Sequence, residues 1–123
     1  MSTAIILFAH GARDPEWATP MRRVQALVRE QAAGAVVELA FLEFMSPTLA
    51  ECAGQLVADG ATRIVVLPMF IARGGHLKRE VPEMMDALRA AHPGVEFTLA
   101  AVIGEQDLVI QAMASAALEI AGR

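Results

Sequence analysis

The sequence is short of cysteine and has no excess of basic residues, and each shortage excludes a class of site. Cys52 is the single cysteine among 123 residues, so the chain can form neither an intrachain disulfide nor a cysteine-cluster zinc site. Lysine plus arginine total 10, against 14 aspartate plus glutamate. A chain with this balance lacks the basic surface that nucleic acids and anionic membranes attract. We therefore expect no nucleic-acid partner and no membrane partner.

Long apolar runs and glycine-rich loops are also missing. No stretch is long enough to span a bilayer, none resembles a signal peptide, and no low-complexity linker divides the chain. Gly11 stands alone after the first apolar run, so neither a dinucleotide fingerprint nor a phosphate-binding loop is present. We expect one domain, residues 1–123, in a reducing cytoplasm.

Short apolar runs alternate with helical patterns along the chain. The runs lie at 4–9, 35–42, 63–67 and 95–102, and the first and third are apolar throughout, which is typical of strands buried on both faces. The helical stripes are Trp17, Met21, Val24 and Leu27; Leu49, Cys52, Ala53, Leu56 and Val57; Val81, Met84, Met85 and Leu88; and Val109, Ala112, Met113, Ala116, Ala117 and Ile120. Ser46 before Pro47 predicts the start of the second helix.

Four such strand–helix units predict a three-layer α/β lobe of the flavodoxin-like or chelatase-like kind. Right-handed crossovers favour a four-stranded parallel sheet in the order 2-1-3-4, with helices on both faces. Pro68 has no N–H for a ladder hydrogen bond, so we expect the third strand to end near Leu67 and a loop to run from Met69 to Lys78. Strands 1 and 3 are then neighbours at the point where the strand order reverses, which is where such sheets bind ligands.

Two histidines and one glutamate follow these strands. His10 comes after the first strand, His76 follows Gly74-Gly75 after the third, and Glu43 ends the second. Parallel strands present their carboxyl ends at one edge, so we expect the three side chains to converge there. Two imidazoles and a carboxylate suit a borderline divalent ion and leave coordination positions open. The alternative for each histidine is an ordinary loop residue that hydrogen-bonds to backbone.

Cations surround both histidines although the chain is acidic overall. They are Arg13, Arg73, Lys78 and Arg79. A ligand with carboxylates would explain this local reversal of charge. The alternative is a solvated loop in which Arg13 pairs with Asp14 or Glu16.

Three segments carry motifs: LFAHGARDP at 7–15, FLE at 41–43, and VLPMFIARGGH at 66–76 followed by Val81-Pro82. In this order and spacing they resemble the short CbiX-type sirohydrochlorin chelatases, class II enzymes that insert cobalt, iron or nickel into sirohydrochlorin without ATP. The resemblance implies no tightly bound cofactor, with Co²⁺, Fe²⁺ or Ni²⁺ as a substrate in cobalamin or sirohaem biosynthesis. Ala12 stands where the family often has Ser, and Glu80 where it often has Asp.

The resemblance also assigns roles to residues. It implies that His10, Glu43 and His76 bind the metal, with His10 as proton acceptor and Glu43 as third ligand or proton relay. Residues that would contact the tetrapyrrole are Arg13, Glu43, Met45, Phe70, Ile71, Ala72, Arg73, Gly74, Gly75, Lys78 and Arg79. Long family members contain two lobes, so a one-lobe chain implies a homodimer. The last helix agrees, because it is apolar around more of its circumference than one buried face requires.

Two other functions fit the same residues. A non-catalytic metal carrier would use the three metal donors and would not accelerate metal insertion. A hydrolase or phosphoryl-transfer enzyme would use His10, Gly11 and Arg13 at a phosphate site and would need no metal.

Overall fold

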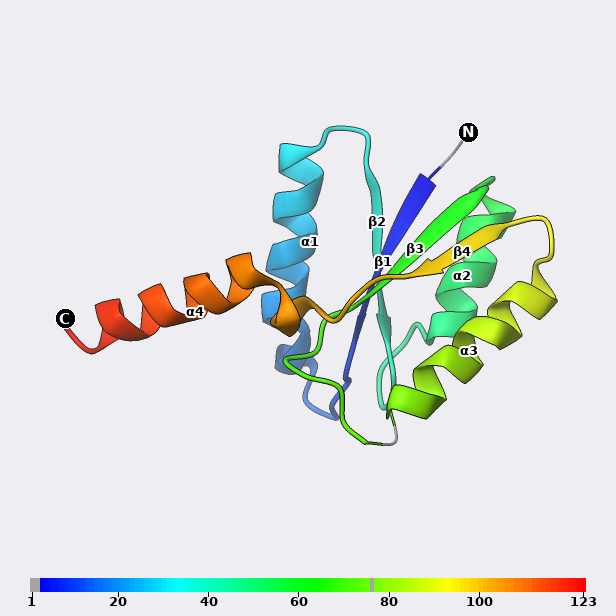
Figure 1. The fold of residues 1–123 in the computed structure, drawn as a ribbon. Helices are drawn as coiled ribbons and strands as arrows, with labels where there is room; N and C mark the ends of the chain where they lie inside the picture. The colour runs from blue at the N-terminus through cyan, green and yellow to red at the C-terminus, as the bar shows by residue number, and fades with distance from the viewer. Residues whose placement is uncertain (1–2, 76) are drawn as a thin grey trace.

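The computed structural model describes residues 3–75 and 77–123, which form the predicted α/β lobe (Figure 1). Its strands are β1 (Thr3–Ala9), β2 (Val36–Phe41), β3 (Arg63–Pro68) and β4 (Glu96–Leu99). All neighbours pair in parallel, and the order β2-β1-β3-β4 confirms the predicted topology. The helices are η1 (Pro15–Ala18), α1 (Thr19–Gln31), α2 (Leu49–Ala58), α3 (Leu77–Ala91), η2 (Ile103–Glu105) and α4 (Asp107–Ile120).

β1 is the centre of the fold because it pairs with both β2 and β3. Its side chains alternate between the two faces, and both faces are apolar, as the uninterrupted run predicted. Ile6 and Phe8 belong to the cluster beneath α2 and α3, whereas Leu7 belongs to the cluster beneath α1. Helices therefore cover both faces of the sheet, as expected (Figure 1).

The start of α2 differs from the prediction. The helix begins at Leu49 rather than at Pro47, and Thr48 is its N-cap. The Glu51 N–H donates to Thr48 Oγ1 (3.2 Å), and the Thr48 N–H donates to Glu51 Oε1 (2.8 Å). These two reciprocal hydrogen bonds pair the backbone N–H groups of Thr48 and Glu51. A helix capped by Ser46 would not form them.

α3 and β4 also have different bounds from those expected. α3 begins at Leu77, so the predicted loop is wrong at Leu77 and Lys78. The helix continues through Pro82 because Leu77, Val81, Met85 and Leu88 form a buried stripe that outweighs one missing hydrogen bond. β4 stops at Leu99, because the backbone then turns into η2, where the Gly104 N–H donates to the Phe70 carbonyl (2.9 Å).

α4 lies apart from the sheet. It projects away from the lobe in Figure 1, and none of its residues is buried. α1 packs chiefly on β2 and β1, and Leu67 of β3 is partly buried against the same apolar cluster. Within the described part of the chain, no helix has both the length and the hydropathy needed to cross a membrane.

Removing the α2 cap will lower stability. Thr48→Ala is expected to reduce the free energy of unfolding by about 1 kcal/mol, because the Glu51 N–H loses its acceptor. Chemical denaturation checks this. Ser46→Ala is the matched control, since the sequence predicted a cap there and the structure gives it none; equal losses in both variants would contradict the assignment.

Candidate metal site at the carboxyl edge of the sheet

Backbone hydrogen bonds beyond the strand ends bring three loops together. Ala9 pairs with Phe41 at the end of the β1–β2 ladder, and the Leu42 N–H then donates to the Ala9 carbonyl (2.8 Å). On the other side of β1, the Met69 N–H donates to the Phe8 carbonyl (2.8 Å). The residues that follow β1, β2 and β3 therefore lie at one edge, as the strand order predicted.

His10 and Glu43 meet at this edge. His10 Nδ1 lies 3.2 Å from Glu43 Oε1, and both side chains are partly exposed. A neutral imidazole that donates its Nδ1–H to the carboxylate keeps a lone pair on Nε2, which is the arrangement that metal-binding histidines use. Glu43 Oε2 is buried and has no hydrogen-bond partner among the described residues, so a second oxygen remains for a cation.

Two aromatic residues fix the position of His10. The Phe70 ring lies 4.6 Å from the imidazole, centroid to centroid, with an interplanar angle of 36°, and Phe70 is itself packed against Phe8. The Trp17 Nε1–H donates to the His10 carbonyl (3.0 Å). The imidazole is therefore held from its backbone and from one ring face.

Gly11 allows Glu43 to approach. A Cβ at position 11 would overlap the carbonyl oxygen of Glu43 and press on Met45. Only glycine leaves this space, so the residue beside His10 sets the distance between the two loops.

The loop after β3 carries the predicted substrate cations. Arg73 Nε lies 3.7 Å from Glu105 Oε1, and both line a cavity of about 150 Å³ together with Lys78. Gly104 packs directly against the backbone of Ile71, where a Cβ would overlap. The segment that follows β4 therefore supports this loop.

The remaining predicted contact residues differ in exposure. Ile71 is 69% exposed, and Ala72, Gly74, Gly75 and Arg79 are also exposed. Phe70 is buried behind His10, and Met45 is half-buried against the cluster under α1. Ile71 thus exposes an apolar side chain at the surface of the loop, whereas Phe70 mainly supports the imidazole.

Arg13 and Phe44 form a second feature of the site that the sequence did not fully predict. The Arg13 guanidinium lies 5.4 Å from the centre of the Phe44 ring, and the alternative pairing with Asp14 or Glu16 has no contact to support it among the described ion pairs. Phe44 is 66% exposed and has a positive φ of 66°, an uncommon conformation that projects its ring outward.

The structure brings two of the three predicted metal donors together. His10 and Glu43 are neighbours, whereas His76 lies outside the described residues. Within the described ranges, no group of three histidine, cysteine or acidic side chains is close enough to hold a metal. The described donor set is therefore one imidazole and one carboxylate.

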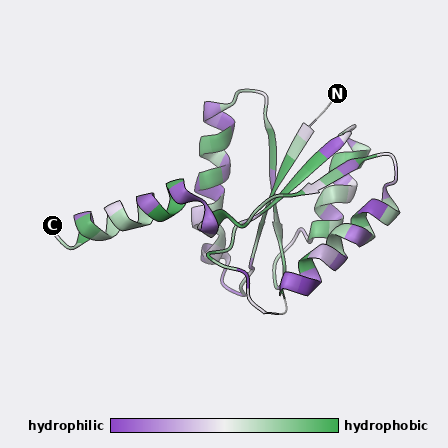
Figure 2. Ribbon diagram, in the orientation of Figure 1, coloured by the Kyte–Doolittle hydropathy of each residue, from purple (hydrophilic) through white to green (hydrophobic). Residues whose placement is uncertain are grey.

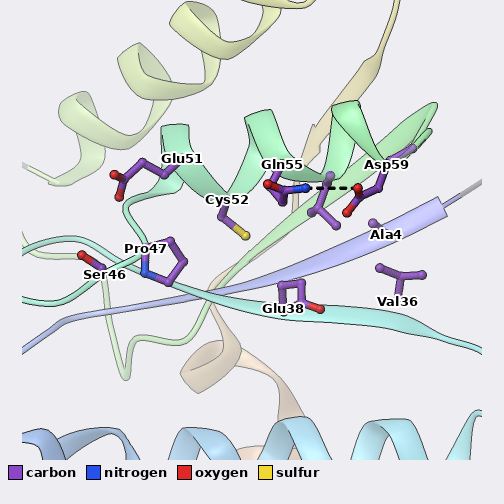
Figure 3. Close-up of a pocket in the computed structure, with 11 residues that line it drawn as sticks. Ala4, Val36, Glu38, Ser46, Pro47, Glu51, Cys52, Gln55 and Asp59 are labelled. Carbon is purple, nitrogen blue, oxygen red and sulfur yellow. Dashed lines mark hydrogen bonds between the residues drawn. The ribbon is translucent and has the colours of Figure 1, made fainter.

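A larger cavity, of about 720 Å³, lies between β2 and α2; Ser46 and Pro47 of the loop after β2 line it, but His10 and Glu43 do not (Figure 3). Glu38, Glu51 and Asp59 line it, and each carboxylate already has a partner: Arg29, the Thr48 N–H and Gln55. Burial, with a smaller contribution from Glu38, raises the pKa of the Cys52 thiol to about 11. An acidic groove with an un-ionised thiol does not suit a ligand that carries carboxylates.

Sequence reasoning missed several residues that support the site. Trp17 was assigned to a helix face, but it lies in η1, is 56% exposed and holds the His10 carbonyl. Gly104 and Glu105 were assigned no role. A lone glycine a few residues after a strand, followed by an acidic residue, is too common a pattern to predict the contacts of Gly104 with Ile71 and of Glu105 with Arg73.

Comparisons with known proteins agree with the fold and the motifs. A CbiX family model matches residues 4–120. A sirohydrochlorin cobaltochelatase of Methanococcus aeolicus is 32% identical over 82 residues, which are 67% of this chain and 57% of that protein. The sirohydrochlorin cobaltochelatase of Saccharolobus solfataricus is 33% identical over 106 residues, which are 81% of each chain.

Solved structures are similar over nearly the whole chain. A CbiX protein of Marinobacter aquaeolei superimposes with a TM-score of 0.86 and 30% identity, covering 98% of both chains. The sirohydrochlorin chelatase SirB of Bacillus subtilis subspecies spizizenii, in complex with cobalt, gives a TM-score of 0.83 and 25% identity. That match covers 98% of this chain and 51% of SirB.

The matches differ in how much of each relative they cover. The chain spans 57% of the length of the M. aeolicus relative and 62% of those from Saccharolobus islandicus. The family model, in contrast, matches nearly all of this chain, including the loops that follow β1, β2 and β3 and carry the candidate site. The chain belongs to the CbiX family.

Proposed function

We propose that the protein is a sirohydrochlorin chelatase, an ATP-independent enzyme that inserts a divalent metal ion into sirohydrochlorin in cobalamin or sirohaem biosynthesis. The observation that carries the proposal is the 3.2 Å pair between His10 Nδ1 and Glu43 Oε1 at the carboxyl edge of the sheet. Relatives named sirohydrochlorin cobaltochelatases, and a similar chelatase fold in complex with cobalt, support the choice of reaction.

In this proposal His10 binds the metal through Nε2 while Glu43 orients the ring and offers its second oxygen. His76 is the proposed second imidazole ligand, as the motif predicts. A site with few protein donors suits a metal that is a substrate, because the ion must leave for the macrocycle. Nitrogen and oxygen donors accept Fe²⁺, Co²⁺ and Ni²⁺ alike, so the donor set fits each of the three.

Metal insertion also needs a proton acceptor. A divalent ion replaces two pyrrole protons: His10 Nε2 would accept one once it has released the metal, and the Glu43 carboxylate would accept the other. His10 and Glu43 are therefore the proposed catalytic residues, with Glu43 as a relay to solvent. This chemistry uses no nucleotide and no tightly bound cofactor.

The exposed cations and apolar side chains around the site form the proposed substrate contacts. Sirohydrochlorin carries peripheral carboxylates, which Arg13, Arg73, Lys78 and Arg79 would pair with. Ile71 and Met45 would contact the macrocycle, with the Phe70–Gly75 loop along its edge. Arg73 would exchange Glu105 for a substrate carboxylate.

The described residues of one copy do not enclose such a ligand beside the site. The cavity beside the site is about 150 Å³, whereas pockets that bury drug-sized ligands have volumes of about 300–1,000 Å³. We propose that residues 1–123 act as one lobe and that two copies form a homodimer with the substrate between them. The single cysteine and the metal chemistry fit a reducing cytoplasm.

Anaerobic incubation of the protein with sirohydrochlorin and Co²⁺, followed by absorbance of the macrocycle, tests the proposal. Wild type should accelerate metallation, and His10→Ala should slow it by about 100-fold or more, since one group is both ligand and base. Glu43→Gln should lower Co²⁺ affinity by about 10- to 100-fold. Wild type that binds Co²⁺ without accelerating metallation would instead identify a metal carrier, and metal-independent phosphate hydrolysis would identify a hydrolase.

The substrate cations are tested by Arg73→Ala, which should raise KM for sirohydrochlorin by about 2- to 5-fold, a small effect because Arg73 is 54% exposed. The effect should be larger at low salt, where attraction between exposed charges is least screened. Arg89→Ala, at the far end of α3, is the matched control. An equal change in both variants, or none in Arg73→Ala at any salt, would refute the assignment.

Gly11→Ala tests the geometry and keeps every donor. The added methyl group has to displace the Glu43 backbone, so Co²⁺ affinity and metallation should both fall by about 10-fold or more. Gly94→Ala is the control, because a Cβ there meets no atom within 4 Å. Activity of Gly11→Ala equal to that of the control would show that the His10–Glu43 distance is unimportant.

A further inference from the structure

Phe44 is a large apolar residue that lies in solvent beside the candidate metal site. It follows Glu43 directly, is 66% exposed and has no ring partner among the described residues. The segments after β1 and β3 also expose one large apolar residue each, Trp17 and Ile71, whereas the others lie on α1, on β2 and along α4, away from the sheet (Figure 2). Trp17 supports His10 and Ile71 is a proposed substrate contact, which leaves the exposure of Phe44 unexplained.

A strained turn produces this exposure. The Met45 N–H donates to the Glu43 carbonyl (2.9 Å), so Phe44 is the central residue of a three-residue γ-turn, with a φ of 66°. A γ-turn with a positive φ at its centre is rare, and it costs free energy for a bulky residue. The side chains before and after Phe44 are held by the protein, because Glu43 contacts His10 and Met45 packs beneath α1. Phe44 is the exposed residue between them.

Glycine would adopt this backbone conformation at a lower cost than phenylalanine. Phenylalanine at position 44 retains the strain and exposes apolar surface to water, and neither effect stabilises the folded chain. Backbone strain of this kind is concentrated at functional sites. The ring is therefore suited to a contact that forms when a ligand binds.

Arg13 adds a cation to this ring. Its guanidinium lies 5.4 Å from the centre of the Phe44 ring and has no carboxylate partner among the described ion pairs. An aromatic face holds a cation electrostatically and leaves the guanidinium N–H groups free to donate to an acceptor. The two residues come from the loops after β1 and β2, which also carry His10 and Glu43. They place an apolar ring and an unpaired cation side by side at the candidate site.

We propose that Phe44 is a substrate-binding residue, whose ring packs on the face of the macrocycle and holds the Arg13 guanidinium toward a peripheral carboxylate. This inference rests on the proposed function. A tetrapyrrole is a flat conjugated ring with acidic side chains at its rim, so aromatic surface suits its face and cations suit its rim. Because Phe44 directly follows Glu43, a macrocycle that receives the metal from the His10–Glu43 pair lies within reach of the Phe44 ring.

The first test is an anaerobic absorbance titration of the full-length protein with metal-free sirohydrochlorin. Phe44→Ala should raise the Kd by about 5- to 10-fold through loss of the aromatic contact, and Phe44→Trp should remain within about 2-fold of wild type. Leu27→Ala, which removes a 48% exposed side chain from α1, is the matched control and should bind like wild type. In turnover, Phe44→Ala should raise KM by the same factor and leave kcat nearly unchanged, because the contact exists before and during reaction.

Co²⁺ affinity shows whether the ring acts on the macrocycle or on its neighbour Glu43. Phe44 carries no metal donor, so Phe44→Ala should bind Co²⁺ like wild type. Wild type that binds no sirohydrochlorin would contradict the proposed function, and this inference with it. Wild type that binds it no better than Phe44→Ala would overturn this inference alone. So would an equal loss of Co²⁺ affinity, or a change in mass measured by light scattering, since the ring would then support the turn or an interface.

Phe44→Gly separates the ring from the backbone. Glycine adopts a φ of 66° without strain, so this variant should unfold at a higher temperature than Phe44→Ala. Its Kd for sirohydrochlorin should nevertheless equal that of Phe44→Ala, because both variants lack the ring. Binding by Phe44→Gly as tight as that of wild type would overturn the inference, because the ring would then be dispensable.

A double-mutant cycle tests the link to Arg13. Arg13→Ala and Phe44→Ala should each weaken sirohydrochlorin binding. The double variant should weaken it by less than the product of the two factors, because loss of the ring already releases the guanidinium. Arg79→Ala is the matched control, since Arg79 has no ring beside it among the described residues, and its factor should multiply with that of Phe44→Ala. Factors that multiply for Arg13 as they do for Arg79 would refute the positioning of Arg13 by the ring.

Discussion

The parallel pairing of β1 with strands on both sides is the constraint on which the rest of the structure depends. Because β2 and β3 hydrogen-bond to β1 in the same direction, the residues after all three strands emerge at one edge. The bonds from Leu42 to Ala9 and from Met69 to Phe8 extend both ladders just beyond the strands. The His10–Glu43 contact, between residues 33 positions apart, follows from that alignment.

The site combines rigid support with a small number of donors. Phe70 and Trp17 hold His10 in place, and Gly11 permits the close approach of the Glu43 loop. In the proposed function, such support would fix His10 before a metal ion binds, so little ordering would be needed on binding. The two described donors are the His10 imidazole and the Glu43 carboxylate, whose buried Oε2 has no hydrogen-bond partner; as proposed, so few donors would hold a cation that can also leave.

The sequence predicted the topology and the two central site residues because both depend on patterns that repeat. Uninterrupted apolar runs identified β1 and β3, and the strand order then placed His10 and Glu43 together. The boundaries were less predictable, because they depend on specific contacts. Thr48 rather than Ser46 caps α2 through Glu51, and the buried stripe from Leu77 extends α3 through Pro82.

Tertiary contacts that have no local signal could not be predicted. Trp17 reaches the carbonyl of a residue seven positions earlier, and Gly104 packs on Ile71, a residue of a different loop. The apolar circumference of the last helix was correctly identified as unusual. The sequence pattern alone did not indicate that α4 leaves the lobe entirely, because that depends on how η2 packs.

Anomalous scattering from a crystal of the protein loaded with Co²⁺ tests the central claim most directly, because it locates the metal. The account predicts one strong peak about 2.1 Å from His10 Nε2, next to Glu43 at the carboxyl edge of β1 and β2. A peak in the acidic groove of Glu38, Glu51 and Asp59, with none at His10, would contradict it.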